Sequence, residues 1–254
     1  MGFETINLSG HKIPAKDRQR IKRTINRLIG AEIVEETTER VVVQCLLKVT
    51  AFPPDKILRR GCLLSSSLVS DAFSAFLRGD RQLAESILER DEEVDRLYFL
   101  LVRLLRALIV NPRLSEKLNV SLIGCLDYRL IASLVETIAD QAVEIAMLTL
   151  KFPQGILPPR TAKQFEFLTQ RIKDAYEEVV KTIFAPEEKA LASATAKRIE
   201  AQQQLQLVET ELNGIKPGPP VAAVTGFATV KRIFDGISDI IDLVTPKSRL
   251  EKGL

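Results

Sequence analysis

The stretch of sequence that decides the fold is Arg78-Gly-Asp-Arg-Gln-Leu-Ala-Glu-Ser-Ile-Leu-Glu-Arg-Asp-Glu-Glu-Val-Asp-Arg-Leu-Tyr-Phe-Leu-Leu-Val-Arg103. Gly79 and Asp80 predict the end of one helix and the cap of the next, because these residue types favour those positions. The residues that follow place apolar side chains three and four positions apart, the spacing of an amphipathic helix. Asp91 and Asp95 lie one turn apart at the border of its packed face. A carboxylate in such a place needs a cation, a hydrogen bond or a metal ion.

The same helical periodicity extends outward over most of the chain. Helices are predicted at residues 55–78, 80–111, 117–151, 160–184, 186–213 and 221–244. Glycine and proline separate them, notably at Asn111-Pro112, at Pro153, Gly155 and Pro158-Pro159, and at residues 216–220. Six long helices grouped three and three predict a mainly α fold of two antiparallel three-helix bundles.

A small αβ leader is predicted ahead of the bundles. Residues 19–29 have the pattern of a short basic helix, residues 32–37 are interpreted as a turn, and residues 40–49 as a β-rich strand. Pro53-Pro54 ends this pattern. The predicted parts are therefore the leader at residues 1–54, the first bundle at 55–153 and the second bundle at 158–247.

The composition narrows the class of protein. The formal net charge of the 254-residue chain is only +3, although the first 60 residues hold 12 Lys/Arg against 7 Asp/Glu. A basic leader can contact an acidic partner, but a solvated basic surface is the commoner case. The three cysteines are odd in number and lie among apolar residues, which favours reduced thiols and a cytoplasmic protein. No segment reaches the roughly 20 apolar residues of a membrane span, so no membrane insertion is expected.

A second group of acids lies on the predicted helix at residues 117–151. Glu136, Asp140 and Glu144 form a stripe with a spacing of four residues on an otherwise apolar helix. Such a stripe is most often a solvated face. If it meets Asp91 and Asp95, the converging oxygens suit Mg²⁺, Mn²⁺ or iron. The alternative is that the acids pair with nearby arginines: Arg60, Arg78, Arg90, Arg96 and Arg129.

Three segments, in order, resemble the PhoU family of phosphate-uptake regulators. Residues 77–98 are similar to the family's acid-x-x-x-Asp helix and the glycine-aspartate turn before it. Residues 134–146 look like its later helix, where Leu-Glu-Arg-Ile-Gly-Asp-His-Ala is usual. Residues 28–37 are similar to the piece that joins an AbrB-like DNA-binding domain to the bundles in archaeal members. The resemblance covers roughly residues 20–150 well, and the rest by helix pattern.

The resemblance implies two three-helix bundles and a metal centre in the first. The positions that match its motif are Asp91, Asp95, Glu136 and Asp140, which would hold a divalent or iron-type ion. One departure is that Gln141 replaces the family's histidine and removes a nitrogen donor. In the second bundle residues 190–206 hold no acid-x-x-x-Asp motif, and Asp235 and Asp239 keep the spacing without facing partners. A second metal centre is therefore not expected.

The leader also departs from the family pattern. It is shorter than a complete AbrB-like module, so direct DNA binding by that route is not expected. Its basic residues could still contact phosphates. They are Lys16, Arg18, Arg20, Lys22, Arg23 and Arg27.

No catalytic machinery is found in the sequence, and enzyme activity is not expected. His11 is the only histidine, and no phosphate-binding loop is present. The leading hypothesis, from the resemblance, is a non-enzymatic regulator or adaptor of phosphate uptake. It would couple phosphate status to a phosphate transporter or its signalling partner through helical surfaces, as a homodimer. The alternatives are a transcriptional regulator that binds DNA through the basic leader, and a helical interaction module whose acids bind no metal.

Overall fold

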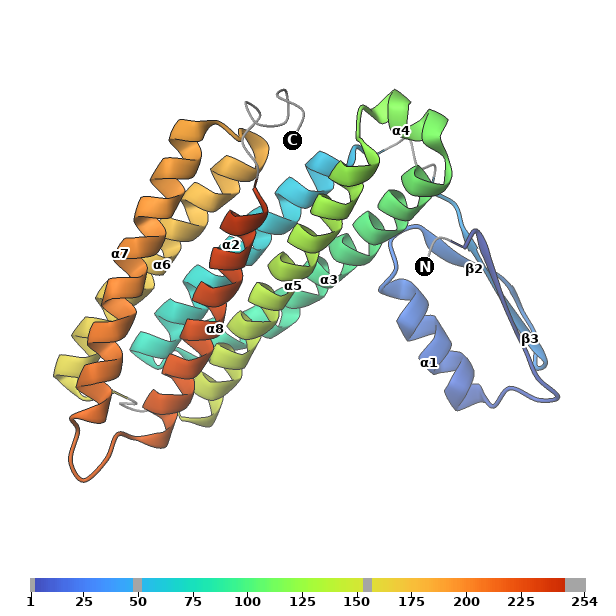
Figure 1. The fold of residues 1–254 in the computed structure, drawn as a ribbon. Coiled ribbons are helices and arrows are strands. Elements are labelled where there is room, and N and C mark those ends of the chain that lie inside the picture. The colour runs from blue at the N-terminus through green and yellow to red at the C-terminus, as the bar shows by residue number, and fades with distance from the viewer. Residues whose placement is uncertain (1–2, 48–51, 153–156, 245–254) are drawn as a thin grey trace. The chain divides into compact units, whose positions relative to one another are not determined.

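The computed structural model describes residues 3–47, 52–152 and 157–244. Within them, a small antiparallel sheet with one helix precedes a set of long helices (Figure 1). The elements are β1 (Thr5–Ser9), α1 (Ala15–Asn26), β2 (Ala31–Glu36), β3 (Arg40–Cys45), α2 (Pro54–Arg78), α3 (Arg81–Val110), α4 (Pro112–Leu118), α5 (Leu122–Lys151), α6 (Pro159–Phe184), α7 (Glu188–Asn213) and α8 (Val221–Leu243). The predicted fold class is confirmed: two three-helix bundles, α2/α3/α5 and α6/α7/α8, follow a small αβ leader.

The turn between α2 and α3 forms as the sequence predicts. Gly79 has a φ of 66°, in the left-handed region that glycine tolerates best. The Asp80 side chain accepts a hydrogen bond from the backbone N–H of Leu83 at 3.0 Å, which caps the start of α3. This turn fixes the rotation of α3 about its axis, and with it the direction in which the α3 carboxylates point.

The predicted helix at residues 117–151 is wrong at its start. A separate helix, α4, occupies Pro112–Leu118, and α5 begins only at Leu122. Between them Asn119 adopts a left-handed conformation with a φ of 53°, which a helix interior excludes. Pro112 starts α4 instead of only ending α3, because proline is favoured at the first position of a helix.

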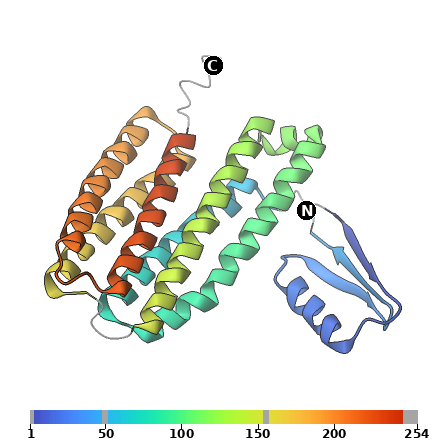
Figure 2. The same ribbon diagram turned by 60° about the horizontal axis from the view of Figure 1, so that its bottom comes forward.

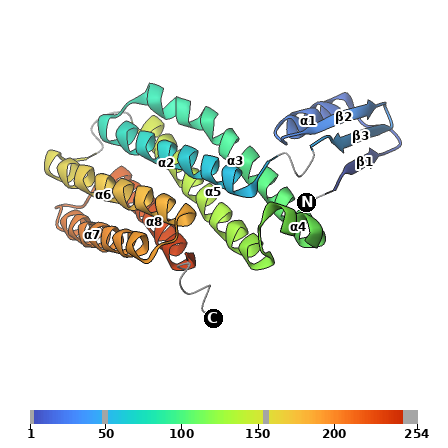
Figure 3. The ribbon, with the colours of Figure 1, turned by 90° about the horizontal axis from the view of Figure 1, so that it is seen from above.

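The described part of the leader contains three strands, two more than the single strand predicted from the sequence. The sheet has the order β1-β3-β2, and both pairs are antiparallel. Helix α1 packs on one face through Ile25, which forms a small core with Val41 and Val43. The leader is thus a helix on a three-stranded sheet (Figure 3).

Several predicted details of the leader are therefore corrected. Residues 32–37, interpreted as a turn, lie mostly in β2, and α1 begins at Ala15 rather than at residue 19. Strand β3 ends at Cys45, and Lys48 and Val49 of the predicted strand lie outside the described residues. Strand β1 was not predicted, although its five residues alternate between polar and apolar types, because the alternation contains only two apolar residues.

Packing divides the chain into two compact units. One contains residues 1–58 and 95–130, and the other contains residues 59–94 and 131–254. Helices α2, α3 and α5 contribute to both units. Pro153 and Gly155, two residues of the predicted boundary between the bundles, lie outside the described residues.

The second unit is built around a buried hydrogen-bond chain. The hydroxyl of Tyr176 on α6 donates to Oγ of Ser65 on α2 at 3.0 Å. The hydroxyl of Ser65 donates in turn to the backbone oxygen of Val135 on α5 at 3.1 Å. Tyr176 and Ser65 are both fully buried. The chain therefore ties three helices of this unit together at one point.

Close approach of α8 depends on two glycines. A Cβ atom at Gly226 would lie 2.4 Å from the ring of Phe76 on α2, and one at Gly236 would lie 3.0 Å from Ile138 on α5. The ring of Phe165 on α6 packs between the rings of Phe76 and Phe227, at centroid distances of 6.0 and 6.1 Å. Figure 2 shows α6, α7 and α8 side by side in yellow, orange and red, with α8 next to α5.

The helices of the described residues differ in length or hydropathy from membrane-spanning helices. No single one of them is long and apolar enough to cross a membrane. Helices α4 and α5 reach that length and composition only when taken together, and they are bent by 76° at the break between them.

We predict unequal effects of cutting the Tyr176–Ser65 bond from its two sides. Tyr176→Phe removes a hydroxyl but leaves Ser65 bonded to Val135, and should lower the free energy of unfolding by about 1 kcal/mol. Ser65→Ala leaves the buried Tyr176 hydroxyl without its acceptor, and should cost about 1–3 kcal/mol. Urea unfolding of both variants measures these changes. The double variant should lose less unfolding free energy than the two single variants lose in sum. A loss equal to that sum would contradict a direct bond between Tyr176 and Ser65.

Candidate metal centre

Three carboxylates come together between α3 and α5. Asp91 and Asp95 lie one turn apart on α3, and Asp140 faces them from α5. Each can offer one carboxylate oxygen such that the three oxygens lie within 4.8 Å of one another. Asp91 and Asp95 are half-buried, whereas Asp140 is exposed. We call these three residues the acid cluster.

The α5 stripe does not act as one unit. Asp140 joins the acid cluster, whereas Glu136, one turn earlier, is not part of that group of three. Glu144, one turn later, forms an ion pair with Arg232 of α8. The three acids of the stripe therefore differ in role: Asp140 belongs to the acid cluster, Glu136 lies one turn before it, and Glu144 binds α8.

Most of the arginines expected near the α3 acids make other contacts. Arg90 donates to Asp71 and, at 2.7 Å, to Oγ of Ser67, both on α2. Arg60 pairs with Glu93. The guanidinium of Arg129 lies over the ring of Tyr98, 5.0 Å from its centroid. These arginines fasten helices to one another.

One cation that reaches the acid cluster comes from the leader. Nη2 of Arg27, just after α1, lies 3.4 Å from Oδ2 of Asp95. Arg27 was not predicted as a partner of Asp95, because 67 residues separate the two and no local pattern connects them. The Arg27 side chain is 53% exposed, so this ion pair has the weak energy of a surface pair, about 0–1 kcal/mol.

The donor set of the cluster fits a hard or borderline cation. Carboxylate oxygens are the preferred ligands of Mg²⁺ and Mn²⁺, and iron also accepts them. Three acids in such proximity repel one another unless positive charge is brought to them. Asp91, Asp95 and Asp140 are therefore the residues that would hold a metal ion, with Glu136 on the adjacent turn of α5.

Comparison with known proteins identifies this region. The family profile described as the PhoU domain matches residues 58–149, which include all three acids of the cluster. Residues 58–149 are a PhoU domain. The resemblance seen in the sequence is thereby confirmed, and the domain spans most of α2 together with α3, α4 and nearly all of α5.

Solved structures share the fold beyond the PhoU domain itself. PhoU from Pseudomonas aeruginosa aligns with a TM-score of 0.66 and 16% identity, over 75% of this chain and 93% of that one. The phosphate transport system regulatory protein PhoU from Streptococcus pneumoniae aligns with a TM-score of 0.64 and 16% identity, over 75% and 91%. No curated protein sequence matches this chain. At such low identity these likenesses show a common fold.

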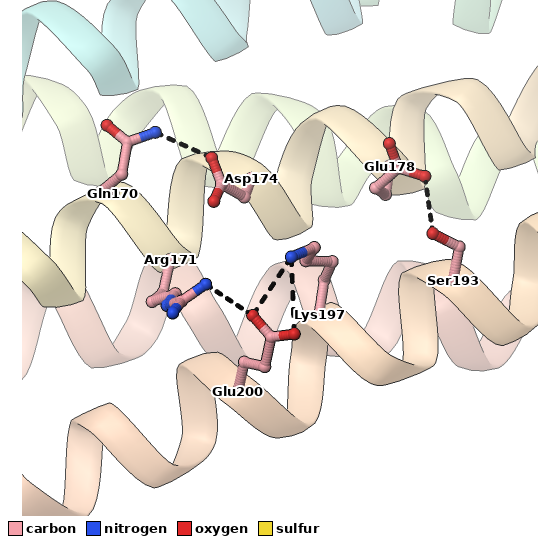
Figure 4. Close-up of polar contacts among 7 residues, drawn as sticks. All are labelled: Gln170, Arg171, Asp174, Glu178, Ser193, Lys197 and Glu200. Atoms are coloured by element: carbon pink, nitrogen blue, oxygen red, sulfur yellow. Dashed lines mark hydrogen bonds and ion pairs between the residues drawn. The ribbon is translucent and has the colours of Figure 1, made fainter.

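Acids in the second bundle pair with their neighbours on the surface between α6 and α7 (Figure 4). Glu200 on α7 accepts from Arg171 of α6 at 2.7 Å and lies 3.2 Å from Nζ of Lys197. Glu178 on α6 accepts from the hydroxyl of Ser193 on α7 at 3.0 Å. Each of these carboxylates thus has a neutralising or hydrogen-bonding partner from the same pair of helices.

The acids of α8 lie in a different setting. Asp235 borders a polar groove of about 350 Å³ between α7 and α8, together with Arg198 and Gln202. Partial burial is the main reason that its pKa is raised, and nearby Asp239 adds to this effect. Arg198 itself pairs with Asp242 at 2.8 Å. The groove combines amides and a cation with a single acid, so it offers a poor donor set for a metal ion.

The basic residues of α1 are partly neutralised by the leader itself. Arg18 and Lys22 both approach Glu36 at the end of β2, at 3.6 and 2.7 Å. Arg27 pairs with Asp95. These ion pairs reduce the positive charge available to a phosphate backbone, whereas Lys16, Arg20 and Arg23 are exposed.

Two of the three cysteines, Cys62 and Cys125, are buried, and Cys45 is half-buried. Cys62 is fully buried, and burial raises the pKa of its thiol to about 12. A thiol of that pKa is protonated at neutral pH and is a poor nucleophile. Cys125 is also buried, and His11 is exposed in the loop after β1.

We predict a pH-dependent cost for removing the charge of Glu178. Hydrogen bonding from Lys181, at 2.6 Å, is the main reason that the pKa of Glu178 lies below its usual value of 4.5. A lowered pKa stabilises the fold above that value, and this stabilisation is lost as the pH falls through the folded-state pKa. Glu178→Gln should therefore cost up to about 1 kcal/mol near pH 7 and little near pH 3.

Chemical denaturation at the two pH values tests this, with Glu166→Gln, an exposed glutamate of the same helix, as the control. An equal cost of Glu178→Gln at both pH values would contradict the assignment.

Proposed function

We propose that this protein is a non-enzymatic regulator of phosphate transport that binds a divalent or iron-type cation at its acid cluster. The observation that supports the proposal most directly is the coincidence of two findings. Residues 58–149 match the PhoU domain, and three of the four acids that the family motif nominates, Asp91, Asp95 and Asp140, have carboxylate oxygens within 4.8 Å of one another. If the motif matched only by sequence, its acids would have no reason to lie close together in the folded chain.

The remaining residues favour regulation over catalysis. The fully buried Cys62 has a raised pKa, and the chain's one histidine is exposed, so a nucleophile paired with a general base is not assembled from them. Helical surfaces, in contrast, are extensive. The regulator would act by binding a protein partner, a phosphate transporter or its signalling protein, as a homodimer in the cytoplasm.

DNA binding through the leader is the weaker alternative. Half of the basic residues nominated for it are engaged in ion pairs, with Glu36 or Asp95. Fewer available cations mean fewer phosphate contacts, and phosphate contacts supply most non-specific affinity for DNA.

The metal centre is tested by elemental analysis of the purified chain. The wild type should contain stoichiometric iron, manganese or zinc, and Asp91→Asn and Asp140→Asn should each lose it, because each replaces a charged ligand with a weaker neutral one. Glu209→Gln, which removes an exposed acid of α7, is the matched control and should keep the metal. Arg27→Gln should keep or raise the metal content, since it removes a cation that competes for Asp95. A wild type that takes up no ion even after incubation with Mn²⁺ or Fe²⁺ would refute the site.

The regulatory role is tested by phosphate uptake in the organism that carries the chain. Deletion of the gene should change the rate of uptake of radiolabelled phosphate at high external phosphate. The wild-type gene should restore the original rate. Uptake that is identical with and without the gene, at both low and high phosphate, would contradict the proposal whether or not the chain binds metal.

A further inference from the structure

The two edges of the leader sheet are protected unequally. The edge strand β2 has a register irregularity between Ile33 and Glu35, and it carries Glu32, Glu35 and Glu36. Bulges and charges of this kind prevent an edge from pairing with another strand. The other edge strand, β1, has the sequence Thr-Ile-Asn-Leu-Ser, with no charge, no proline and a regular register along β3. All five of its residues are exposed. Figure 3 shows β1 at the edge of the sheet, next to β3.

The hydrogen bonds of β1 show which of its backbone groups face outward. Gly10 N–H donates to the Glu39 oxygen, and Cys45 N–H donates to the Glu4 oxygen. Because hydrogen-bonded pairs alternate along an antiparallel ladder, Ile6 and Leu8 bond to β3 between these two points. Their neighbours Thr5, Asn7 and Ser9 therefore direct their backbone N–H and C=O groups away from the sheet.

The strand has a two-fold pattern about Asn7. Ile6 and Leu8 are aliphatic residues placed symmetrically around it, and Thr5 and Ser9 are small hydroxyl residues placed symmetrically one step further out. Ile6 and Leu8 lie opposite Val43 and Val41 of β3, so their side chains are on the face that α1 covers. They nevertheless remain 40% and 37% exposed, because the sheet stops at β1.

We propose that β1 pairs antiparallel with β1 of a second copy of this chain, in the register that places Asn7 opposite Asn7 on the two-fold axis. This register uses the outward groups of Thr5, Asn7 and Ser9 for about six backbone hydrogen bonds. Ile6 of each copy then lies opposite Leu8 of the other in a non-hydrogen-bonded pair, where side chains approach most closely. The two leader sheets become one six-stranded sheet. A contact of this kind is isologous, so it closes at a dimer.

Cysteine cross-linking tests the register in the full chain. Asn7→Cys places two thiols on the axis, at a Cα separation of about 5.5 Å, which suits a disulfide. Mild oxidation should convert most of this variant to a covalent dimer. Thr5→Cys is the matched control, since its thiol would lie opposite Ser9 and about 13 Å from its own copy. It should cross-link poorly alone and well when mixed with Ser9→Cys. Wild-type protein, with its three native thiols, is the blank.

Sedimentation equilibrium tests the same contact without oxidation. Asn7→Lys puts like charges opposite each other on the axis and should raise the dissociation constant of the dimer about fivefold or more. Val34→Lys adds the same charge on the β2 edge and should leave the constant unchanged. The proposal is overturned if Asn7→Cys cross-links no better than Thr5→Cys or the blank. It is also overturned if Asn7→Lys behaves like Val34→Lys. Neither readout depends on bound metal or on phosphate transport.

Discussion

The hydroxyl of Tyr176 imposes the constraint on which the helical unit depends. A fully buried hydroxyl costs stability unless it is hydrogen-bonded, and burial also raises the pKa of Tyr176, so the group remains a proton donor. Its acceptor, Ser65, is anchored to the backbone of α5. Relative movement of α6 against α2 or α5 would break this chain of bonds. The apolar side chains around this chain of bonds, including the rings of Phe76, Phe165 and Phe227, then pack between helices whose relative positions are fixed.

The same frame determines where the acids point. Helix α3 begins at a turn that Gly79 and Asp80 define, and Arg90 holds it to α2 through Asp71 and Ser67. With the rotation of α3 fixed in this way, Asp91 and Asp95 share the face that α5 meets. Helix α5 is in turn held by Ser65 and, through Glu144, by α8. The three acids of the cluster lie on helices, and their positions depend on the packing of α3 and α5 and on the turn that starts α3.

The sequence was informative wherever a pattern was local. Most limits of the long helices, the cap at Asp80 and the pairing of acids at a spacing of four follow from neighbours in the chain. Several other features do not. Strand β1 is exposed along its whole length, the break between α4 and α5 depends on the left-handed conformation of Asn119, and Arg27 meets Asp95 only in the folded chain. Glu136 was nominated with Asp140 because both lie on one stripe, yet α5 brings only one of the two into the group of three.

The ion pair between Arg27 and Asp95 gives the leader a thermodynamic connection to the acid cluster. An arginine and a bound metal ion are alternative counter-charges for the same carboxylate. By linkage, a metal ion would weaken the contact of Arg27 with Asp95 by some factor. The contact would lower the affinity of the cluster for the metal ion by the same factor. Contact of the leader with α3 and a metal ion at the cluster would then be two coupled equilibria that share Asp95. A metal ion bound at the acid cluster would then give the leader, at the amino-terminal end of the chain, more freedom of movement.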